Sequence, residues 1–392
     1  MNKFSFIQRI LISGAIIFLA AGVWLLFGRH EAEREPVTNL SMAAQPVATD
    51  GFERAAGPRE FDFPDDHGPH PAFQTEWWYY TGNLETVDGR HFGYQLTFFR
   101  RALTPLEIEN GEGSEWRTNQ VYLAHFAISD IEKKDFYYQE RLAREGAGLA
   151  GAQGSGGLKV WLEDWMVEQV AEDRYQMKAS TDDLDIELEL VDLKGVVLQG
   201  DHGYSQKGGQ PGNASYYFSQ TRLKTSGKLR VASKYYAVEG FSWMDHEFST
   251  SALGDGQVGW DWFSIQLDDG SELMLFSLRN ADPDIDPDLA GTVIDADGST
   301  HSLSAGEFEL SVLDTWRSPA NQAEYPAKWR IRIPTEGIEI TVTPLMANQE
   351  LHTFFTYWEG AVEISGVRDG KEVSGYGYVE LTGYAQSMQG EF

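Results

Sequence analysis

The stretch FSWMDHEFSTSALGDGQVGWDWFSIQL, from Phe241 to Leu267, combines a strand-like pattern with many aromatic and ionisable side chains. In its second half, Trp260 to Leu267, successive side chains of an extended strand would face opposite sides. Asp261 would then share a face with Phe263, Ile265 and Leu267. Burying an unpaired carboxylate is costly, so Asp261 either has a polar partner at the strand end or has a raised pKa. A carboxyl group with a raised pKa can act as a general acid.

Short extended segments continue on both sides of this stretch, separated by turn pairs such as Asp269-Gly270, Asp297-Gly298 and Asp369-Gly370. Residues 185–190 (DIELEL) alternate strictly between apolar and polar side chains. Residues 158–170 fit either a short helix or a strand. The pattern predicts an antiparallel all-β chain in two halves, with closed barrels as the arrangement that removes exposed strand edges. The remaining predicted strands are residues 77–84, 93–100, 121–129, 196–199, 215–222, 233–239, 272–278, 308–313, 329–334, 338–343, 361–365 and 375–381.

Composition excludes several classes of function. The chain has 392 residues, of which 42% are hydrophobic, so it can build about two cored domains. Its net charge of −29 argues against nucleic acid as a partner, because binding it requires clustered Lys and Arg. The chain has no cysteine, which excludes disulfides, thiol catalysis and thiolate metal sites.

The N-terminal segment predicts a membrane anchor. Residues 10–27 are 18 uncharged, mostly apolar positions, and as a helix they would be about 27 Å long, close to the thickness of a bilayer core. Lys3 and Arg9 precede them, which favours a cytoplasmic N-terminus and an exported body. A cleaved signal peptide is the alternative, although bulky side chains run directly to Gly28. Residues 31–58 are polar and rich in Pro and Ala, as in a tether.

Five segments together resemble the AttH family, which is related to carotenoid 1,2-hydratase and is often labelled a secreted, lipocalin-like hydrolase. The segments are HPAFQTEWWYYTGNL (70–84), GYQLTFFR (93–100), AHFAISD (124–130), WMDHEFSTS (243–251) and GWDWFSIQLDDG (259–270). The resemblance covers roughly residues 55–390 in the same order. It implies two tandem lipocalin-like β-barrels, which we place at residues 59–248 and 249–392 after an N-terminal anchor or signal at residues 1–30.

The same resemblance implies a periplasmic location, at the inner membrane if the anchor is retained. It also implies an apolar small molecule or lipid as ligand, and an ABC transporter permease of the lipoprotein-export type as a partner. The hydratase branch of the family adds water to an isolated carbon–carbon double bond without metal or organic cofactor. We therefore expect no cofactor here.

A cofactor-free hydratase needs an acid, aromatic faces that stabilise a carbocation, and a positioned water. The resemblance and the residue types together suggest Asp245 or Asp261 as the acid and His246 as the partner of the water. A structural role for these residues remains the alternative, because a buried indole N–H also needs an acceptor. The expected ligand contacts are Glu76, Trp77, Trp78, Tyr79, His125, Trp243, Trp260 and Trp262.

Other chemistries have weaker support in the sequence. Glu247 follows His246, but no second histidine stands four positions after the first, so the zinc-protease pattern is absent. No G-x-S-x-G nucleophile motif occurs, which weakens the hydrolase label. Two functions of different class remain: an anchored carrier of an apolar ligand that serves an exporter, and a hydratase acting on a polyene or terpenoid. The sequence does not decide whether the protein is an enzyme.

Overall fold

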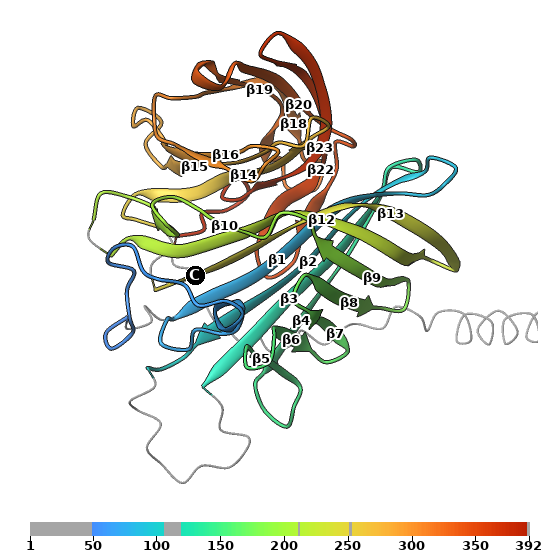
Figure 1. Ribbon diagram of the computed structural model, residues 1–392, viewed down its shortest axis with the longest axis vertical. Coiled ribbons are helices and arrows are strands. Elements are labelled where there is room, and N and C mark those ends of the chain that lie inside the picture. The colour runs from blue at the N-terminus through green and yellow to red at the C-terminus, as the bar shows by residue number, and fades with distance from the viewer. Residues whose placement is uncertain (1–48, 106–118, 211, 251–252, 390–392) are drawn as a thin grey trace, which may run out of the picture. The chain divides into compact units, whose positions relative to one another are not determined.

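The computed structural model describes residues 49–105, 119–210, 212–250 and 253–389, which form two antiparallel β-sheets (Figure 1). Two short 3₁₀ helices, η1 (Asp65–His67) and η3 (Pro334–Glu336), are the helices of the described residues. None of these residues forms a helix able to cross a membrane. The predicted anchor, residues 10–27, lies outside the described part of the chain.

The first sheet follows the order β4-β3-β2-β1-β13-β12-β9-β8-β7-β6-β5, with β10 and β11 paired to β12. Strand β6 returns against β2, β3 and β4, so this sheet is a nearly closed barrel. Its strands are β1 (Thr75–Glu85), β2 (His91–Ala102), β3 (Gln120–Asp130), β4 (Asp135–Arg144), β5 (Ala150–Gln153), β6 (Lys159–Leu162), β7 (Trp165–Ala171), β8 (Arg174–Ser180), β9 (Leu184–Asp192), β10 (Val196–Leu198), β11 (Tyr204–Gln206), β12 (Ala214–Val231) and β13 (Lys234–Ser249).

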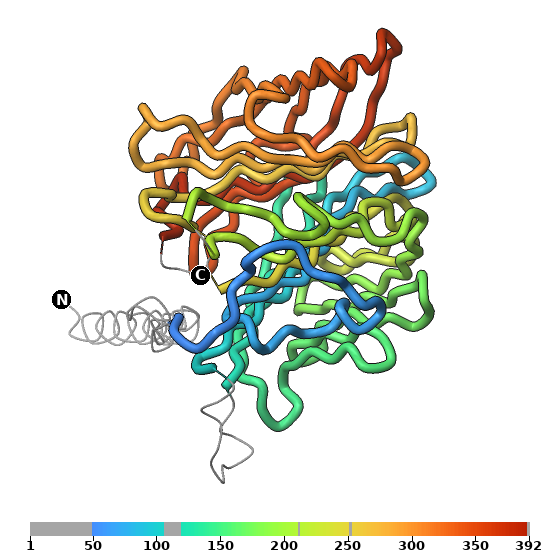
Figure 2. The backbone as a smooth tube through the Cα atoms, turned by 60° about the vertical axis from the view of Figure 1, so that its left-hand side comes forward, coloured from blue at the N-terminus to red at the C-terminus, as the bar shows by residue number. Residues whose placement is uncertain are grey.

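The second sheet follows the order β17-β16-β15-β14-β23-β22-β20-β19-β18, with β21 paired to β22. It curls into a half-barrel, drawn from yellow to red in Figures 1 and 2. Its strands are β14 (Gln257–Leu267), β15 (Glu272–Asn280), β16 (Asp288–Ile294), β17 (Thr300–Leu303), β18 (Glu309–Arg317), β19 (Glu324–Ile333), β20 (Ile338–Pro344), β21 (Glu350–His352), β22 (Thr356–Arg368) and β23 (Lys371–Leu381).

Alternation along the strands builds a core inside each barrel. On β9 the apolar residues of the predicted DIELEL pattern are buried, and the residues between them are half-buried or exposed. The first core contains Trp78, Phe218 and Met244, and the second contains Phe263 and Trp329. The prediction of an all-β chain with two barrel-like halves is therefore confirmed. Residues 158–170, which fitted either a short helix or a strand, form β6 and β7.

The outer faces of the two sheets pack against each other and bury a third apolar cluster. Strand β13 is buried on both faces from Ser242 to Ser249. Met244 faces the first core, whereas Trp243 packs with Trp262 of the second sheet. The two faces of this one strand therefore belong to different environments, one inside the first barrel and one between the sheets.

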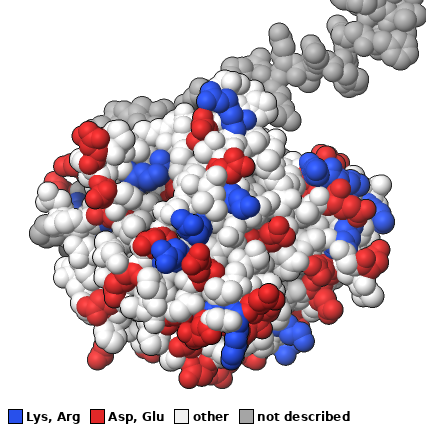
Figure 3. All heavy atoms as spheres, turned by 90° about the horizontal axis from the view of Figure 1, so that it is seen from above, with Lys and Arg blue, Asp and Glu red and all other residues white. Residues whose placement is uncertain are grey.

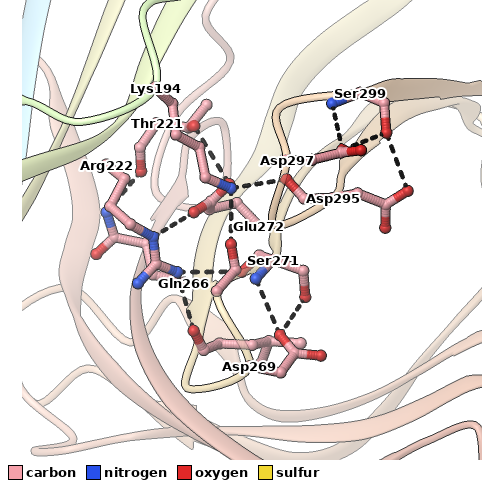
Figure 4. A network of polar contacts seen from close by, with 12 residues as sticks. Lys194, Thr221, Arg222, Gln266, Asp269, Ser271, Glu272, Asp295, Asp297 and Ser299 are labelled. Atoms are coloured by element: carbon pink, nitrogen blue, oxygen red, sulfur yellow. Dashed lines mark hydrogen bonds and ion pairs between the residues drawn. The ribbon is translucent and has the colours of Figure 1, made fainter.

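One end of this interface is fixed by a cluster of ion pairs around Glu272 (Figure 4). Lys194 Nζ lies 2.6 Å from Glu272 Oε2 and also donates to the backbone oxygens of Gly270 and Asp295, at 2.6 and 2.8 Å. The Arg222 guanidinium pairs with the other oxygen of Glu272. Every charge in this cluster has an opposite partner, so the cluster joins β12 and the β9–β10 turn to two hairpins of the second sheet.

The charged side chains at the surface show no single-sign patch in the view of Figure 3. Acidic and basic side chains are interspersed over that face. The net charge of −29 is therefore not gathered into one acidic patch on that face.

Candidate functional site

A partly enclosed cavity of about 80 Å³ lies between the two sheets, away from the cores of both barrels. Its walls are mainly aromatic, and three carboxyl groups face it. The first sheet and its loops contribute Trp77, Tyr79, Phe99, Lys207, Tyr217, Asp245, Glu247 and Leu253, and the second sheet contributes Trp260, Trp262, Phe276, Leu278 and Glu380. An apolar pocket with a few convergent polar groups is the usual form of a small-molecule site.

Asp245 is the most buried acid of the cavity wall, with 3% of its surface exposed. Its carboxyl oxygens accept hydrogen bonds from Tyr217 Oη at 2.6 Å, Ser219 Oγ at 2.5 Å and Trp243 Nε1 at 2.7 Å. No cation among the described residues pairs with it. Burial raises the pKa of Asp245 to about 7 despite these three hydrogen bonds. At neutral pH this group can therefore either hold a proton or give one up.

Glu380 faces Asp245 from the second sheet. Trp260 Nε1 donates to Glu380 Oε2 at 2.6 Å. Burial raises the pKa of Glu380 to about 7, and the charges of Asp245 and Glu247 add to the rise. Two acids from two different sheets thus titrate near neutrality at one aromatic cavity. Such groups are rare away from functional sites, although structural networks also produce them.

Two further pairs of polar groups lie in the wall. Lys207 Nζ lies 2.8 Å from Glu247 Oε1 and 4.4 Å from the centre of the Phe276 ring. Trp262 Nε1 donates to Tyr217 Oη at 3.0 Å. That bond orients the Tyr217 hydroxyl so that its own proton points to Asp245. The wall therefore holds Asp245 in a fixed position while leaving it without a compensating charge.

His246 lies on the opposite face of β13 from Asp245, inside the first barrel. Trp78 is its cross-strand neighbour, with ring centres 4.9 Å apart, whereas the neighbour of Asp245 is Tyr79. His246 Nε2 lies 2.8 Å from Glu76 Oε1, and burial lowers the pKa of the imidazole. The structure therefore does not bring His246 together with Asp245, and it places Glu76 and Trp78 inside the barrel as well.

Donor atoms of His70, Glu76 and His246 lie within 4.8 Å of one another, a spacing that a metal ion could use. The Glu76 carboxylate is already neutralised, because Arg100 Nε lies 2.8 Å from its Oε2. His70 Nδ1 also lies 2.8 Å from Glu76 Oε1. Burial opposes the charge, but Arg100 and both histidines hold the pKa of Glu76 well below its usual range. The donor set fits a hydrogen-bonded ion cluster better than a cation site beside an arginine.

Asp261 shares its face of β14 with Phe263, as the alternation predicted, and lies outside the cavity between the sheets. Arg279 Nε lies 2.8 Å from its Oδ1, and Tyr384 Oη lies 3.0 Å from both carboxyl oxygens. Burial raises the pKa of Asp261 in spite of the arginine. The structure thus gives Asp261 the polar partner at a strand end that was the structural alternative.

The other six predicted ligand contacts, besides Glu76 and Trp78, divide into three groups. Trp77, Tyr79, Trp260 and Trp262 line the cavity. Trp243 lies behind Asp245 as a hydrogen-bond donor. His125 is buried at a neighbouring part of the interface, where its Nδ1 lies 2.7 Å from Tyr357 Oη and its Nε2 lies 2.9 Å from Glu140 Oε2.

Sequence reasoning missed the acids that the second sheet brings to this region. Glu380 and Glu359 stand in the segments YGYVEL and TYWEGAV. Each is a lone carboxylate in a strand pattern of apolar and aromatic residues. A lone carboxylate in an apolar strand was also the feature that singled out Asp261. A search for this feature along the whole chain would have found Glu359 and Glu380.

Comparison with known proteins identifies the family. The AttH-like family model matches residues 54–384. The crystal structure of an AttH-type protein from Nitrosomonas europaea has a TM-score of 0.75 at 35% identity, covering 85% of this chain and 100% of that one. Kievitone hydratase of Nectria haematococca has the same fold, with a TM-score of 0.64 at 16% identity over 86% of this chain and 97% of that one.

A sequence relationship to a hydratase is also present. Kievitone hydratase of Fusarium solani subsp. phaseoli is 26% identical over 175 residues, which are 43% of this chain and 49% of that protein. The chain thus spans about half the length of the curated relative that it matches. The family model covers most of the chain, and the related crystal structure is matched over its whole length. The protein belongs to the AttH-like family.

Proposed function

We propose that the protein is a hydratase-like enzyme that adds water to a carbon–carbon double bond of an apolar substrate held in the cavity between the sheets. The observation that carries this proposal is the presence of Asp245 and Glu380, each with a pKa raised to about 7, at one aromatic cavity. The hydratases among the relatives support the reaction class. A polyene or terpenoid is the substrate class that suits walls of this kind.

Asp245 is the acid in this proposal. In its neutral form it donates its proton to an alkene carbon, and the two electrons of the double bond form the new C–H bond. The neighbouring carbon becomes a carbocation. The faces of Trp260, Trp262 and Phe276 surround the cavity and can stabilise that charge by cation–π attraction.

Glu380 is the base. A water molecule in the cavity bonds through its oxygen to the carbocation, and the Glu380 carboxylate takes the proton that this water loses. The products are the alcohol, ionised Asp245 and protonated Glu380. The next cycle requires a proton to return to Asp245 and one to leave Glu380. Burial keeps the two pKa values close together, so neither transfer is strongly uphill.

A carrier of an apolar ligand is the second candidate, because the same aromatic cavity would hold such a molecule without chemistry. The role beside an ABC-type exporter and the periplasmic location are proposals that rest on the resemblance of the sequence to the AttH family. In the carrier the acids of the cavity would have no chemical step to perform, which is why we place the hydratase first.

The test is an incubation of the purified full-length chain with an acyclic isoprenoid polyene in isotopically labelled water, followed by mass spectrometry of the product. We expect a product that has gained one labelled water. Asp245→Asn should lower turnover by roughly 10²- to 10⁴-fold, the usual contribution of a positioned proton donor. The proposed base is tested in the same assay with Glu380→Gln. Its control is Glu372→Gln, because Glu372 lies on the same strand but is exposed. Stoichiometric binding of the polyene without any labelled product would favour the carrier instead.

A further inference from the structure

Two tyrosines line the cavity, and their hydroxyl oxygens differ in what they accept. Tyr217 donates its proton to Asp245 Oδ2 at 2.6 Å, and its oxygen accepts from Trp262 Nε1 at 3.0 Å. Tyr79 donates its proton to Glu359 Oε1. No donor among the described residues bonds to the oxygen of Tyr79. Because a phenolic oxygen can accept as well as donate, Tyr79 has a free acceptor position at the cavity.

Glu359 on β22 fixes the direction of the Tyr79 proton. The residue is 1% exposed, and no lysine or arginine of the described chain pairs with it. Burial, together with the charge of Glu380, raises the pKa of Glu359 well above its usual range, so the group is neutral. Its Oε2 has no hydrogen-bond partner among the residues that the structure describes. The proton of the neutral carboxyl group is therefore on Oε2, and Oε1 is the carbonyl oxygen that accepts from Tyr79.

Strand pairing places this tyrosine beside both acids of the proposed reaction. Glu359 and Glu380 are direct cross-strand neighbours in the β22–β23 pairing, so their side chains share one face of the second sheet. Glu380 lines the cavity, and its Oε2 already accepts from Trp260. Tyr79 is itself the direct neighbour of Asp245 in the β1–β13 pairing. The Tyr79 hydroxyl is thus next to the proposed acid and, through Glu359, next to the proposed base.

We propose that Tyr79 orients the water that adds to the double bond, and that Glu359 is a positioning residue that keeps the Tyr79 oxygen as an acceptor. The inference rests on the function proposed above and assigns the position of its nucleophile. One O–H of the water donates to the Tyr79 oxygen, and the other donates to the Glu380 carboxylate. With both hydrogens held, a lone pair of the water oxygen is directed at the carbocation.

The step balances without a further reactant. A lone pair of the water oxygen forms the C–O bond, the O–H bond directed at Glu380 breaks, and that proton passes to the carboxylate. The O–H bond directed at Tyr79 stays intact and becomes the hydroxyl group of the product. Tyr79 keeps its own proton, because burial and the neighbouring carboxyl groups raise its pKa well above the usual range. Tyr79 and Glu359 are therefore unchanged by the reaction.

A poorly oriented water would change the product as well as the rate. A carbocation that captures no water loses a proton from an adjacent carbon, and the electrons of that C–H bond form a double bond again. The Asp245 carboxylate takes the proton. In deuterated water the recovered alkene then carries deuterium from the first protonation. The ratio of alcohol to deuterated alkene therefore reports the orientation of the water separately from the strength of the acid.

The activity test measures this ratio by mass spectrometry, with the full-length protein and the acyclic isoprenoid polyene in deuterated water. Tyr79→Phe removes the acceptor, and Glu359→Leu removes the group that holds the hydroxyl proton. We expect both changes to lower the ratio of alcohol to deuterated alkene roughly tenfold to a hundredfold, the scale of a misplaced reactant. A merely structural role would lower the total turnover and leave the ratio unchanged.

Three further variants serve as comparisons. Glu359→Gln keeps a carbonyl oxygen for the Tyr79 hydroxyl, so its ratio should lie between those of the wild type and Glu359→Leu. Tyr376→Phe is the control for Tyr79→Phe, because Tyr376 is 39% exposed. Glu363→Leu is the control for Glu359→Leu, because Glu363 lies on the same strand but is exposed. Both controls should leave the ratio at the value of the wild type.

A second measurement does not depend on turnover. The probes are a saturated acyclic isoprenoid tertiary alcohol and the saturated hydrocarbon of the same skeleton, each titrated into the protein by calorimetry. The wild type should bind the alcohol more tightly, because its hydroxyl group donates to the Tyr79 oxygen. Tyr79→Phe and Glu359→Leu should each lower this preference roughly three- to tenfold, the value of one hydrogen bond. Tyr79→Phe keeps the ring, so it maintains the test if Glu359→Leu fails to fold.

The two measurements separate the two proposals. If the wild type forms labelled alcohol and the ratio is unchanged in folded Tyr79→Phe and Glu359→Leu, the hydratase stands and the role of Tyr79 is wrong. If no polyene is hydrated but both variants lose the preference for the alcohol, the hydratase is wrong and the acceptor role of Tyr79 stands. An unchanged preference in folded variants contradicts the inference whether or not turnover is found.

Discussion

Two groups of buried carboxyl side chains lie at the interface between the sheets, and they are neutralised in different ways. Glu272 is paired with Lys194 and Arg222, and backbone oxygens accept further hydrogen bonds from both cations (Figure 4). Asp245 and Glu380 at the cavity have only hydroxyl and indole donors. Burying an acid without a cation costs stability unless the acid holds a proton. The ion pairs of the Glu272 cluster therefore stabilise the fold, whereas the cavity acids can exchange protons near neutral pH.

The largest expected effect is on the Glu272 cluster. Lys194→Met removes a cation that is 8% exposed and makes three short contacts, so Glu272 is left with Arg222 as its one charged partner among the described residues. We expect the free energy of unfolding to fall by about 3–5 kcal/mol, the usual cost of breaking a buried pair. Denaturant unfolding with circular dichroism measures it. A loss below about 1 kcal/mol would be the value of an exposed pair, and would contradict the structural role of this cluster.

At the cavity, removal of a charge should raise the stability of the folded protein instead of lowering it. The folded-state pKa of Asp245, about 7, lies above its ordinary value of 3.8. The folded protein therefore binds the proton more tightly, and this contribution to stability is full below pH 3.8 and is lost as pH rises to 7. Asp245→Asn, which has no charge, should be more stable than the wild type at neutral pH by up to about 4 kcal/mol, at 1.36 kcal/mol per pKa unit.

The measurement is thermal unfolding of the wild type and Asp245→Asn from acid to mildly alkaline pH. The wild type should lose stability relative to the variant across this range. A difference that does not change with pH would mean that Asp245 has the same pKa in the folded and the unfolded protein and is therefore ionised at neutral pH, and Asp245 would then be excluded as the acid. Glu372→Gln, on an exposed position of β23, should show no such pH dependence.

The contrast between the two clusters also explains what the sequence could predict. Period-two patterns such as DIELEL predicted strands because one face of each strand contacts a core. Strand β4 was missed because its side chains are exposed or half-buried and carry little alternation. Asp245, Tyr79 and Trp262 were selected by residue type and motif, and the structure places them at one cavity.

What local patterns cannot supply is the pairing between distant segments. Asp245 meets Glu380 only because β14 pairs with β23 and the outer faces of the two sheets pack together. His125 likewise meets Tyr357 across 232 positions of the chain. Alternation separated His246 from Asp245 on β13, yet their adjacency in the motif led us to place both in one site. The rule that neighbours on a strand face opposite sides applies to them as it does to Asp261.

The smallest expected effect is that of Asp261, the residue first singled out as an acid. Asp261→Asn removes its ion pair with Arg279, whose side chain is 22% exposed, and keeps an acceptor for Tyr384. We expect a change in stability of about 1 kcal/mol or less, because loss of the partly exposed ion pair and loss of a buried charge act in opposite directions. Turnover of the isoprenoid polyene should change by less than about threefold, since Asp261 lies outside the cavity. The assay is the labelled-water incubation with Asp245→Asn beside it. If Asp261→Asn lost activity as fully as Asp245→Asn while remaining folded, the acid would be Asp261, and the reaction would have to take place at the end of the second barrel instead of between the sheets.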